Sequence, residues 1–499
     1  MTEEISNKDL KETSLESKKT DRRNSFLWYS YDLADTFFSQ AVISLAFTPF
    51  ALLLGVLNDW SYIKAFVIVS IVMAGSNLLV AILGPIIGAV SDTLGKRKIM
   101  VIIVAAVMVT STILIAVWEN FWWACGLFVI ANFMYQNGRM LYDSQIPFIA
   151  QTEDRSTTQA IGGAIAAFGS IIGVLVGLVL NGLGSAEKWT PVNTNIWELA
   201  NEPIPQVNLG NLRYVFLVSG IIIILFSIPY LFHKEVENPS GLKPRENLKK
   251  SLGSLKESLK TIAKDRNSLL FFIGWFFLVD AANTTILFMV PVIEGAVGVD
   301  NSTLTYIIIL SGILLSIVFG FVTGRVLRAK GPKNTFLISG IAWMAAIIFT
   351  MLAGLQYKTE LVWNGWSYNT IIYVIPWWIM FFGAICIGIG FGSIWIVGRQ
   401  FIMVLAPPSK LAQYNGFQKI AGRVSAIASP LIFSGMMVLG IKLLALSANH
   451  SFRIALASIL LFFIIGEILV GFIKDPYKRY DKGERAPYIG LYDKKKSEE

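Results

Sequence analysis

Long apolar runs separated by short polar turns dominate the sequence. Twelve of them reach about 20 residues, the length that a helix needs to cross the hydrocarbon core of a bilayer. The runs cover residues 28–57, 65–90, 98–118, 121–143, 157–183, 211–232, 268–293, 302–327, 334–355, 369–399, 412–441 and 452–473. The pattern predicts an all-α polytopic membrane protein with twelve transmembrane helices.

A polar stretch divides the twelve runs into two sets of six. Within this stretch leucines recur at helical spacing and lysines fill the other faces, which predicts an amphipathic helix on a membrane surface or on the inner face of the protein. We expect a disordered cytoplasmic tail at 1–25, a six-helix bundle at 26–232, a cytoplasmic linker with the amphipathic helix at 233–267, a second six-helix bundle at 268–474 and a cytoplasmic tail at 475–499.

The composition excludes several classes of protein. Hydrophobic residues make up 54% of the chain and charged residues 15%, against about 25% charged in an ordinary soluble domain. With two cysteines and two histidines, the sequence argues against a disulfide framework, a metal site or a histidine-based catalytic centre, and we expect no cofactor and no enzyme activity. It contains no Walker-type phosphate loop, which disfavours ATP-driven transport by this chain alone.

The distribution of positive charge predicts the orientation in the membrane. With both termini inside, only six of the 42 Lys and Arg residues fall at outer loops or outer helix ends. These six are Lys64, Lys188, Arg213, Lys358, Lys442 and Arg453. The bias predicts cytoplasmic termini and an even number of spans. The net charge of +9 is thus assigned to a membrane surface and not to nucleic acid. We expect the cell membrane, or a vacuolar or endomembrane in a eukaryote.

The two halves of the chain repeat each other weakly. Matches occur in corresponding spans, at an offset that is constant within each span. They pair Asp32 with Asp280, Asp35 with Asn283, Arg139 with Arg399, Gly162 with Gly422, and Gly88 and Gly95 with Gly324 and Gly331. Parallel six-helix repeats are typical of secondary transporters that rock two bundles about a midplane site.

The segment Gly84 to Lys98 resembles the loop signature between spans two and three of the major facilitator superfamily. Within that superfamily, the chain resembles the autophagy-related vacuole effluxer family, whose bacterial and archaeal members are often called unknown major facilitators. The resemblance rests on Trp28 to Thr36, on Leu141 to Pro147, and on a third set that runs from Gly398 to Pro430. It implies two pseudo-symmetric six-helix bundles, alternating access, and amino-acid efflux from the vacuole as the best-characterised role.

The resemblance also implies a cytoplasmic gate. The matching residues of the signature loop are Gly88, Asp92, Gly95 and Arg97. In the superfamily the Asp of this loop acts as a latch that holds the two halves together when the protein is open outward. We therefore expect Asp92 to meet the start of the eleventh span, around 411–415.

Charged residues inside the apolar runs are the candidate substrate and proton pathway. Asp280 follows eleven apolar or small residues, so it lies about 18 Å into its span. A carboxylate at that depth is costly, and such residues commonly serve pathways and proton relays. The other candidates are Asp32, Asp35, Asn283, Arg139, Asp143, Arg399 and Arg423. Structural hydrogen bonds or an interfacial position remain the alternative for each of them.

We therefore expect a secondary active transporter of a small polar solute. An amino acid would offer an ammonium group to Asp32, Asp35 or Asp280 and a carboxylate to Arg139, Arg399 or Arg423. Protons are a candidate coupling ion, and we expect a monomer in the lipid bilayer. The alternatives are a sugar or drug transporter of the same superfamily, or a receptor or lipid scramblase that keeps the transporter fold without transport.

Overall fold

The computed structural model describes residues 22–145, 149, 155–182, 209–235, 241, 243–299, 302–363, 366–373, 375–406 and 411–474. The expected tails at 1–21 and 475–499 lie outside these residues. The first half comprises α2 (Arg22–Phe38), the π-helical η1 (Ser39–Phe47), α3 (Thr48–Leu57), α4 (Tyr62–Leu94), α5 (Arg97–Ile115), α6 (Phe121–Asp143), α8 (Arg155–Gly182), α9 (Leu209–Ser227) and the 3₁₀ turn η2 (Pro229–Phe232). Segments α2, η1 and α3 run on without a break as one crossing.

The second half follows the helix α10 (Pro244–Lys264). It comprises α11 (Arg266–Leu287), α12 (Met289–Val292), η3 (Ile293–Val297), α13 (Ser302–Leu352), β1 (Gln356–Trp363), β2 (Trp366–Tyr373), η4 (Trp377–Ile379), α14 (Met380–Leu405), α15 (Leu411–Val438), η6 (Leu439–Leu443) and α16 (Ala448–Gly471). Helix α13 contains two crossings, because Gly331 adopts a φ of 76° that breaks the helix, and Pro332 follows it.

Eleven of the described helical segments are long and apolar enough to cross a membrane. Helix α6 is the twelfth crossing, and it packs against α4 and α5 although it carries Arg139 and Asp143. The all-α architecture of two six-helix bundles is confirmed, and the protein is an integral multi-pass membrane protein.

Short polar residues position the helix ends. The side chains of Ser61, Asn120 and Ser447 accept hydrogen bonds from backbone N–H groups at the starts of α4, α6 and α16. Gly95 ends α4 with a φ of 63° and donates its N–H to the carbonyl of Ser91.

One expected boundary is wrong. The tenth run was expected to begin at 369, but residues 366–373 form strand β2, which pairs antiparallel with β1. The tenth crossing instead begins near Trp377 and ends at Leu405. The sequence between the strands reads Asn364-Gly365, a pair that favours two-residue hairpin turns. Counting apolar residues alone does not detect this turn signal.

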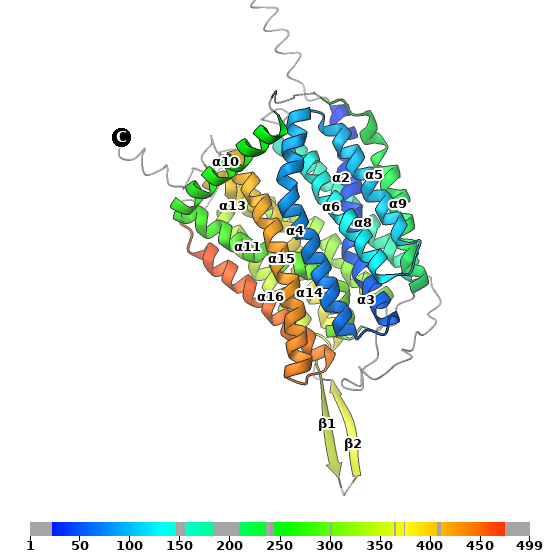
Figure 1. Cartoon of the computed structure of the whole chain (residues 1–499). Coiled ribbons are helices and arrows are strands. Elements are labelled where there is room, and N and C mark those ends of the chain that lie inside the picture. The colour runs from blue at the N-terminus through cyan, green and yellow to red at the C-terminus, as the bar shows by residue number, and fades with distance from the viewer. Residues whose placement is uncertain are drawn as a thin grey trace, which may run out of the picture.

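The two ends of the molecule differ. Helix α10 crosses one end of the bundles, and the β1–β2 hairpin projects from the other (Figure 1). We call these the α10 end and the hairpin end. The bundles contact each other through two symmetry-related pairs of helices, α4 with α15 and α8 with α13.

The hairpin end is sealed by apolar contacts between the halves. The ring of Phe66 on α4 lies 4.8 Å from that of Phe288 and 6.0 Å from that of Phe433. Leu45 and Val174 of the first half pack in one buried cluster with Tyr306 and other residues of the second half. The structure is therefore closed at the hairpin end.

Candidate functional site

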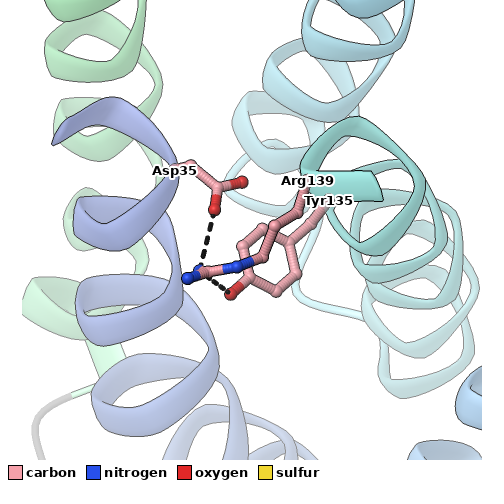
Figure 2. A network of polar contacts seen from close by, with 3 residues as sticks. All are labelled: Asp35, Tyr135 and Arg139. Carbon is pink, nitrogen blue, oxygen red and sulfur yellow. Dashed lines mark hydrogen bonds and ion pairs between the residues drawn. The ribbon is translucent and has the colours of Figure 1, made fainter. Parts of the chain in front are cut away.

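An ion pair joins the first and fourth crossings deep in the first bundle. The guanidinium of Arg139 donates to Asp35 Oδ2 at 3.1 Å and to the hydroxyl of Tyr135 at 3.4 Å. Figure 2 shows Asp35 on α2 facing both α6 side chains. Because Tyr135 precedes Arg139 by four residues, both project from the same face of α6.

The two partners differ in their access to water. The side chain of Asp35 keeps 2% of its accessible surface, whereas that of Arg139 keeps 46%. Water can therefore reach the guanidinium of Arg139 but not the carboxylate of Asp35.

Further charges gather around this pair. A carboxylate oxygen of Asp32 lies against Gly162 of α8, where an added Cβ would come within 3.3 Å of it. Arg399 of α14 is exposed and lies within electrostatic range of Asp32, Asp143 and Arg139. We call Asp32, Asp35, Arg139, Asp143 and Arg399 the charged cluster. It brings α2 and α6 of one half together with α14 of the other.

At this cluster, matching positions of the two halves carry different side chains. Arg139 has Asp35 as its carboxylate partner, but the counterpart of Asp35 in the second half is the uncharged, half-buried Asn283. Arg399 donates its Nε–H to the carbonyl of Trp395 at 3.3 Å. Among the described residues it makes no ion pair within 4.0 Å. An exposed guanidinium without a carboxylate can bind an anionic group.

Asp280 lies apart from the charged cluster. Its side chain is fully buried in α11. The hydroxyl and the backbone N–H of Ser429 on α15 face the carboxyl group, but neither contact has the geometry of a full hydrogen bond. The counterpart of the water-accessible Asp32 is thus a dry carboxyl at the contact between α11 and α15.

The same stretch of α15 contacts the first half through a backbone carbonyl that has no hydrogen-bond donor from residue 430 of its own helix. Pro430 has no N–H, so the carbonyl of Ala426 lacks its donor within the helix. Asn77 of α4 supplies a replacement, because its Nδ2 donates to that oxygen at 3.0 Å. Asn77, Ala426 and Ser429 therefore link the contact between the bundles to the surroundings of Asp280.

The expected gate is described in part. Gly95 forms the turn after α4, Gly88 lies in α4 facing Met140, and Arg97 is buried at the start of α5. The side chain of Asp92 lies outside the described residues, as does that of Arg423. The latch and the role of Arg423 therefore stay predictions.

Several residues of the site were not expected from the sequence. Tyr135 could have been found from the sequence, because its spacing of four residues from Arg139 puts both on one face of a helix. Asn77 is an isolated polar residue in an apolar run, but such residues commonly form hydrogen bonds with their own helix, so sequence alone does not single it out. The described part of the chain contains no group of three His, Cys, Asp or Glu residues that could hold a metal ion.

His233 follows η2, outside the membrane-spanning segment, and its Nδ1 lies 3.0 Å from the carbonyl oxygen of Tyr230. Burial lowers the pKa of this imidazole.

Two six-helix bundles with a water-accessible charged cluster at their contact define a multi-pass membrane protein of the transporter class. The sequence model of the Major Facilitator Superfamily matches residues 33–430. The chain belongs to this superfamily, whose members are transporters of small-molecule solutes.

Similar proteins span almost the whole chain. An uncharacterized MFS-type transporter of Bacillus subtilis (strain 168), YxiO, is 22% identical over 460 residues, which cover 91% of this chain and 95% of that protein. The crystal structure of a D-xylose-proton symporter superposes with a TM-score of 0.64 at 13% identity, covering 94% of this chain and 100% of the other. A bacterial homologue of the human lysosomal transporter Spinster, inward-facing and unoccupied, gives 0.61 at 15% identity, covering 92% and 100%. These structures share the fold.

Proposed function

We propose that the protein is a secondary active transporter of a small zwitterionic solute of the amino-acid type. The observation that carries this proposal is Arg399, an exposed guanidinium without a carboxylate partner that lies within electrostatic range of Asp32. A substrate carboxylate would bind Arg399 and its ammonium group would bind Asp32. Arg139 is already neutralised by Asp35, so it would shape the site without competing for the carboxylate.

This charge pattern favours a zwitterion over the other solutes considered. A zwitterion offers a carboxylate to Arg399 and an ammonium group to Asp32, whereas a neutral sugar offers neither charge and a cationic drug offers no carboxylate to Arg399. A non-transporting receptor or scramblase has no need for buried titratable groups at the contact between the halves. Amino-acid efflux, the role implied by the resemblance to the vacuole effluxer family, agrees with a zwitterionic substrate.

We further propose that the α10 end faces the cytoplasm and that the protein acts as a monomer. The bias of Lys and Arg supports this orientation. The apolar seal at the hairpin end then closes the outer side of the protein. Asp92 would stabilise the opposite, outward-open state by binding at the start of α15, where a helix N-terminus favours an anion by about 0.3–1 kcal/mol.

Proton coupling is proposed for Asp280. A protonated carboxyl can stay in its dry place between α11 and α15, whereas a carboxylate there costs several kcal/mol unless water or a cation reaches it. Loss of the proton would therefore favour separation of the two helices, at the stretch of α15 that Asn77 contacts. The D-xylose-proton symporter, which shares the fold, is named for coupling to protons.

Substrate binding can be tested on purified protein. A thermal-shift screen against amino acids, sugars and other metabolites would identify the ligand, and uptake into proteoliposomes would measure transport. We expect Arg399→Gln to weaken binding of a zwitterion roughly ten- to a hundredfold, the value of a hydrogen bond to a charged group. Arg325→Gln, which removes an exposed cation of α13 outside the charged cluster, is the matched control. Equal affinity in both variants would refute the proposed substrate contact.

Coupling needs a separate measurement. We expect Asp280→Asn to abolish accumulation driven by a pH gradient while counterflow exchange of substrate continues. Asp32→Asn should lose both, because Asp32 is proposed to bind the substrate. Normal gradient-driven accumulation in Asp280→Asn would remove this residue from the coupling role.

A further inference from the structure

An open apolar groove lies at the α10 end of the second half, separate from the charged cluster. It occupies about 490 Å³ in the angle between α10 and the two helices α11 and α15, both of which α10 contacts (Figure 1). Every described residue that lines it is Leu, Ile, Ala or Phe. Of these, Leu259, Leu269 and Ile273 keep 43%, 37% and 40% of their accessible surface, so the groove is open to the surroundings of the protein.

The groove turns away from α14, the helix that contributes Arg399 to the charged cluster. On α11 the residue that faces α14 is Trp275, whose ring lies 5.9 Å from that of Trp395. Leu269, Ile273 and Phe276 line the groove and follow one another at spacings of four and three, so they form a stripe on a different face of α11. Because α11 is a membrane crossing, this stripe lies where acyl chains of lipids contact the protein.

Cations stand beside the groove on both helices that meet at its upper end. On α11, Arg266 precedes Leu269 by three residues, so it begins the same apolar stripe. On α10, Lys256 precedes the groove-lining Leu259 by three residues and Lys260 follows it directly. All three cations are exposed, and among the described residues none of them forms an ion pair within 4.0 Å.

Nearby carboxylates leave this positive charge in place. Asp265 is buried, and its side chain accepts hydrogen bonds from the backbone N–H groups of Asn267 and Ser268 at the start of α11. Over its whole length, α10 carries six Lys or Arg residues against two Glu. The site therefore combines an apolar floor with a cationic edge. A single molecule that matches both is an amphiphile with an anionic headgroup.

We propose that this groove binds one anionic phospholipid of the bilayer, with an acyl chain along α11 and the phosphate at Arg266, Lys256 and Lys260. The stripe below Arg266 extends eleven residues to Phe277, about 16 Å along the helix, which gives an acyl chain a long contact. Basic sites between membrane helices bind anionic headgroups through charge attraction of this kind.

The bound lipid also fastens α10 to the second half. At its other end, α10 is tied to the first half, because Asn247 Nδ2 donates to Thr93 Oγ1 of α4 at 2.8 Å. Lipid and helix together thus link the two halves at the α10 end. The inference holds whichever solute is transported. With the α10 end in the cytoplasm, as proposed above, the lipid comes from the inner leaflet.

Native mass spectrometry of the purified full-length protein would measure the binding. The probes are dioleoylphosphatidylglycerol, which is anionic, and dioleoylphosphatidylcholine, which has the same chains and a zwitterionic headgroup. We expect one saturable molecule of the anionic lipid, bound at least tenfold more tightly than the zwitterionic lipid. Arg266→Gln should weaken it about fivefold, the value of one cation beside an anionic lipid.

The matched control is Arg245→Gln. Arg245 is another exposed arginine, but it lies 14 residues, or about 21 Å, before Leu259 on α10. Ala263→Trp tests the apolar part, because Ala263 is exposed and lines the groove, so a large side chain there should displace the acyl chain and weaken binding. Glycerol 3-phosphate, which has no acyl chains, should not compete with the lipid.

Three results would overturn the proposal. The first is equal affinity of the wild-type protein for the two lipids. The second is equal affinity of Arg266→Gln and Arg245→Gln for the anionic lipid. The third is unchanged affinity in Ala263→Trp together with competition by glycerol 3-phosphate, which would reduce the site to attraction between a headgroup and a basic helix.

The link to α10 has its own readout in amide hydrogen exchange. We expect saturating phosphatidylglycerol to slow exchange in residues 256–264 of the wild-type protein, and phosphatidylcholine to do so much less. In Arg266→Gln, higher concentrations of the anionic lipid should be needed for the same protection. Unchanged exchange in the wild-type protein with the lipid bound would refute the link between the lipid and α10.

Discussion

The two halves of the protein place matching carboxyl groups in opposite surroundings. In the first half, Asp35 is buried but paired with Arg139, and water reaches the arginine. In the second half, Asp280 is fully buried, the side chains that the structure describes place no cation beside it, and the position that matches Asp35 is Asn283. A twofold repeat of the backbone thus carries two different chemistries. The first half holds an ion pair. The second half holds a guanidinium, that of Arg399, with no ion pair within 4.0 Å among the described residues, and the buried carboxyl group of Asp280.

The comparison suggests a division of labour. A buried carboxylate that keeps its cation gains little by changing its charge, so the pair of Asp35 and Arg139 suits a structural role in the first bundle. A carboxylate at the depth of Asp280 is costly, and this cost is the basis of the proton coupling that we propose for it. Coupling and substrate capture would then depend on the second half and on Asp32.

The largest expected effect follows from breaking the pair in the first half. Arg139→Gln leaves the dry carboxylate of Asp35 without its cation, and we expect a loss of about 2 kcal/mol in stability. This is less than for a fully buried pair, because the Arg139 side chain is half exposed. Thermal unfolding of the purified protein measures it.

The double variant Asp35→Asn/Arg139→Gln provides the control. With both charges removed, most of the lost stability should return, since no buried charge is left unpaired. If the double variant is as unstable as Arg139→Gln, the ion pair is not what holds this part of the bundle together.

A smaller effect should follow from making the two halves alike. Asn283→Asp installs in α11 the carboxylate that α2 has. From the repeat we expect it to pair with Arg399 as Asp35 pairs with Arg139. We expect substrate affinity to fall about tenfold, because the new carboxylate competes with that of the substrate for the guanidinium. Isothermal titration with the ligand from the thermal-shift screen would measure this. Asn283→Ala, which removes the amide and adds no charge, should fall less, and an equal loss in both variants would contradict the competition.

The smallest effect on stability is expected for Asp280→Asn. Replacing a dry, unpaired carboxyl by a neutral group of the same shape should change unfolding by less than about 0.5 kcal/mol, whereas Asp35→Asn deprives Arg139 of its partner and should cost about 1 kcal/mol. Both variants can be compared by thermal unfolding at neutral pH. A larger loss in Asp280→Asn than in Asp35→Asn would reverse the comparison.

The sequence predicts the fold well because apolar length and repeat carry most of the information. The runs of about 20 residues locate the crossings. The repeat matches Arg139 with Arg399, and the structure places the two within electrostatic range of each other. The repeat cannot show that Asp280 points away from the charged cluster, since spacing along one helix does not determine which neighbour its face meets. The partner of Arg139 is likewise decided by packing. Asp143 lies four residues away on the same helix, but the ion pair is made by Asp35 on α2.

The predicted start of the tenth crossing is wrong for a different reason. Residues 366–373 are apolar enough to count toward a membrane helix, but they alternate and follow an Asn-Gly pair, so they form a strand outside the bundle. Hydropathy averaged over a window does not distinguish a period of two from a period of 3.6 residues.

The carbonyl of Ala426 has a consequence for the speed of the transport cycle. Because Pro430 denies it a helical donor in every conformation, Asn77 can release it to water without breaking any turn of α15. Exchanging an amide donor for water changes the free energy by only about 0.5–1.5 kcal/mol. If that whole amount entered the barrier, it would alter the rate by roughly a factor of 2 to 10. The bundles can therefore rock past each other at constant helical content, and turnover need not wait for a helix to unwind.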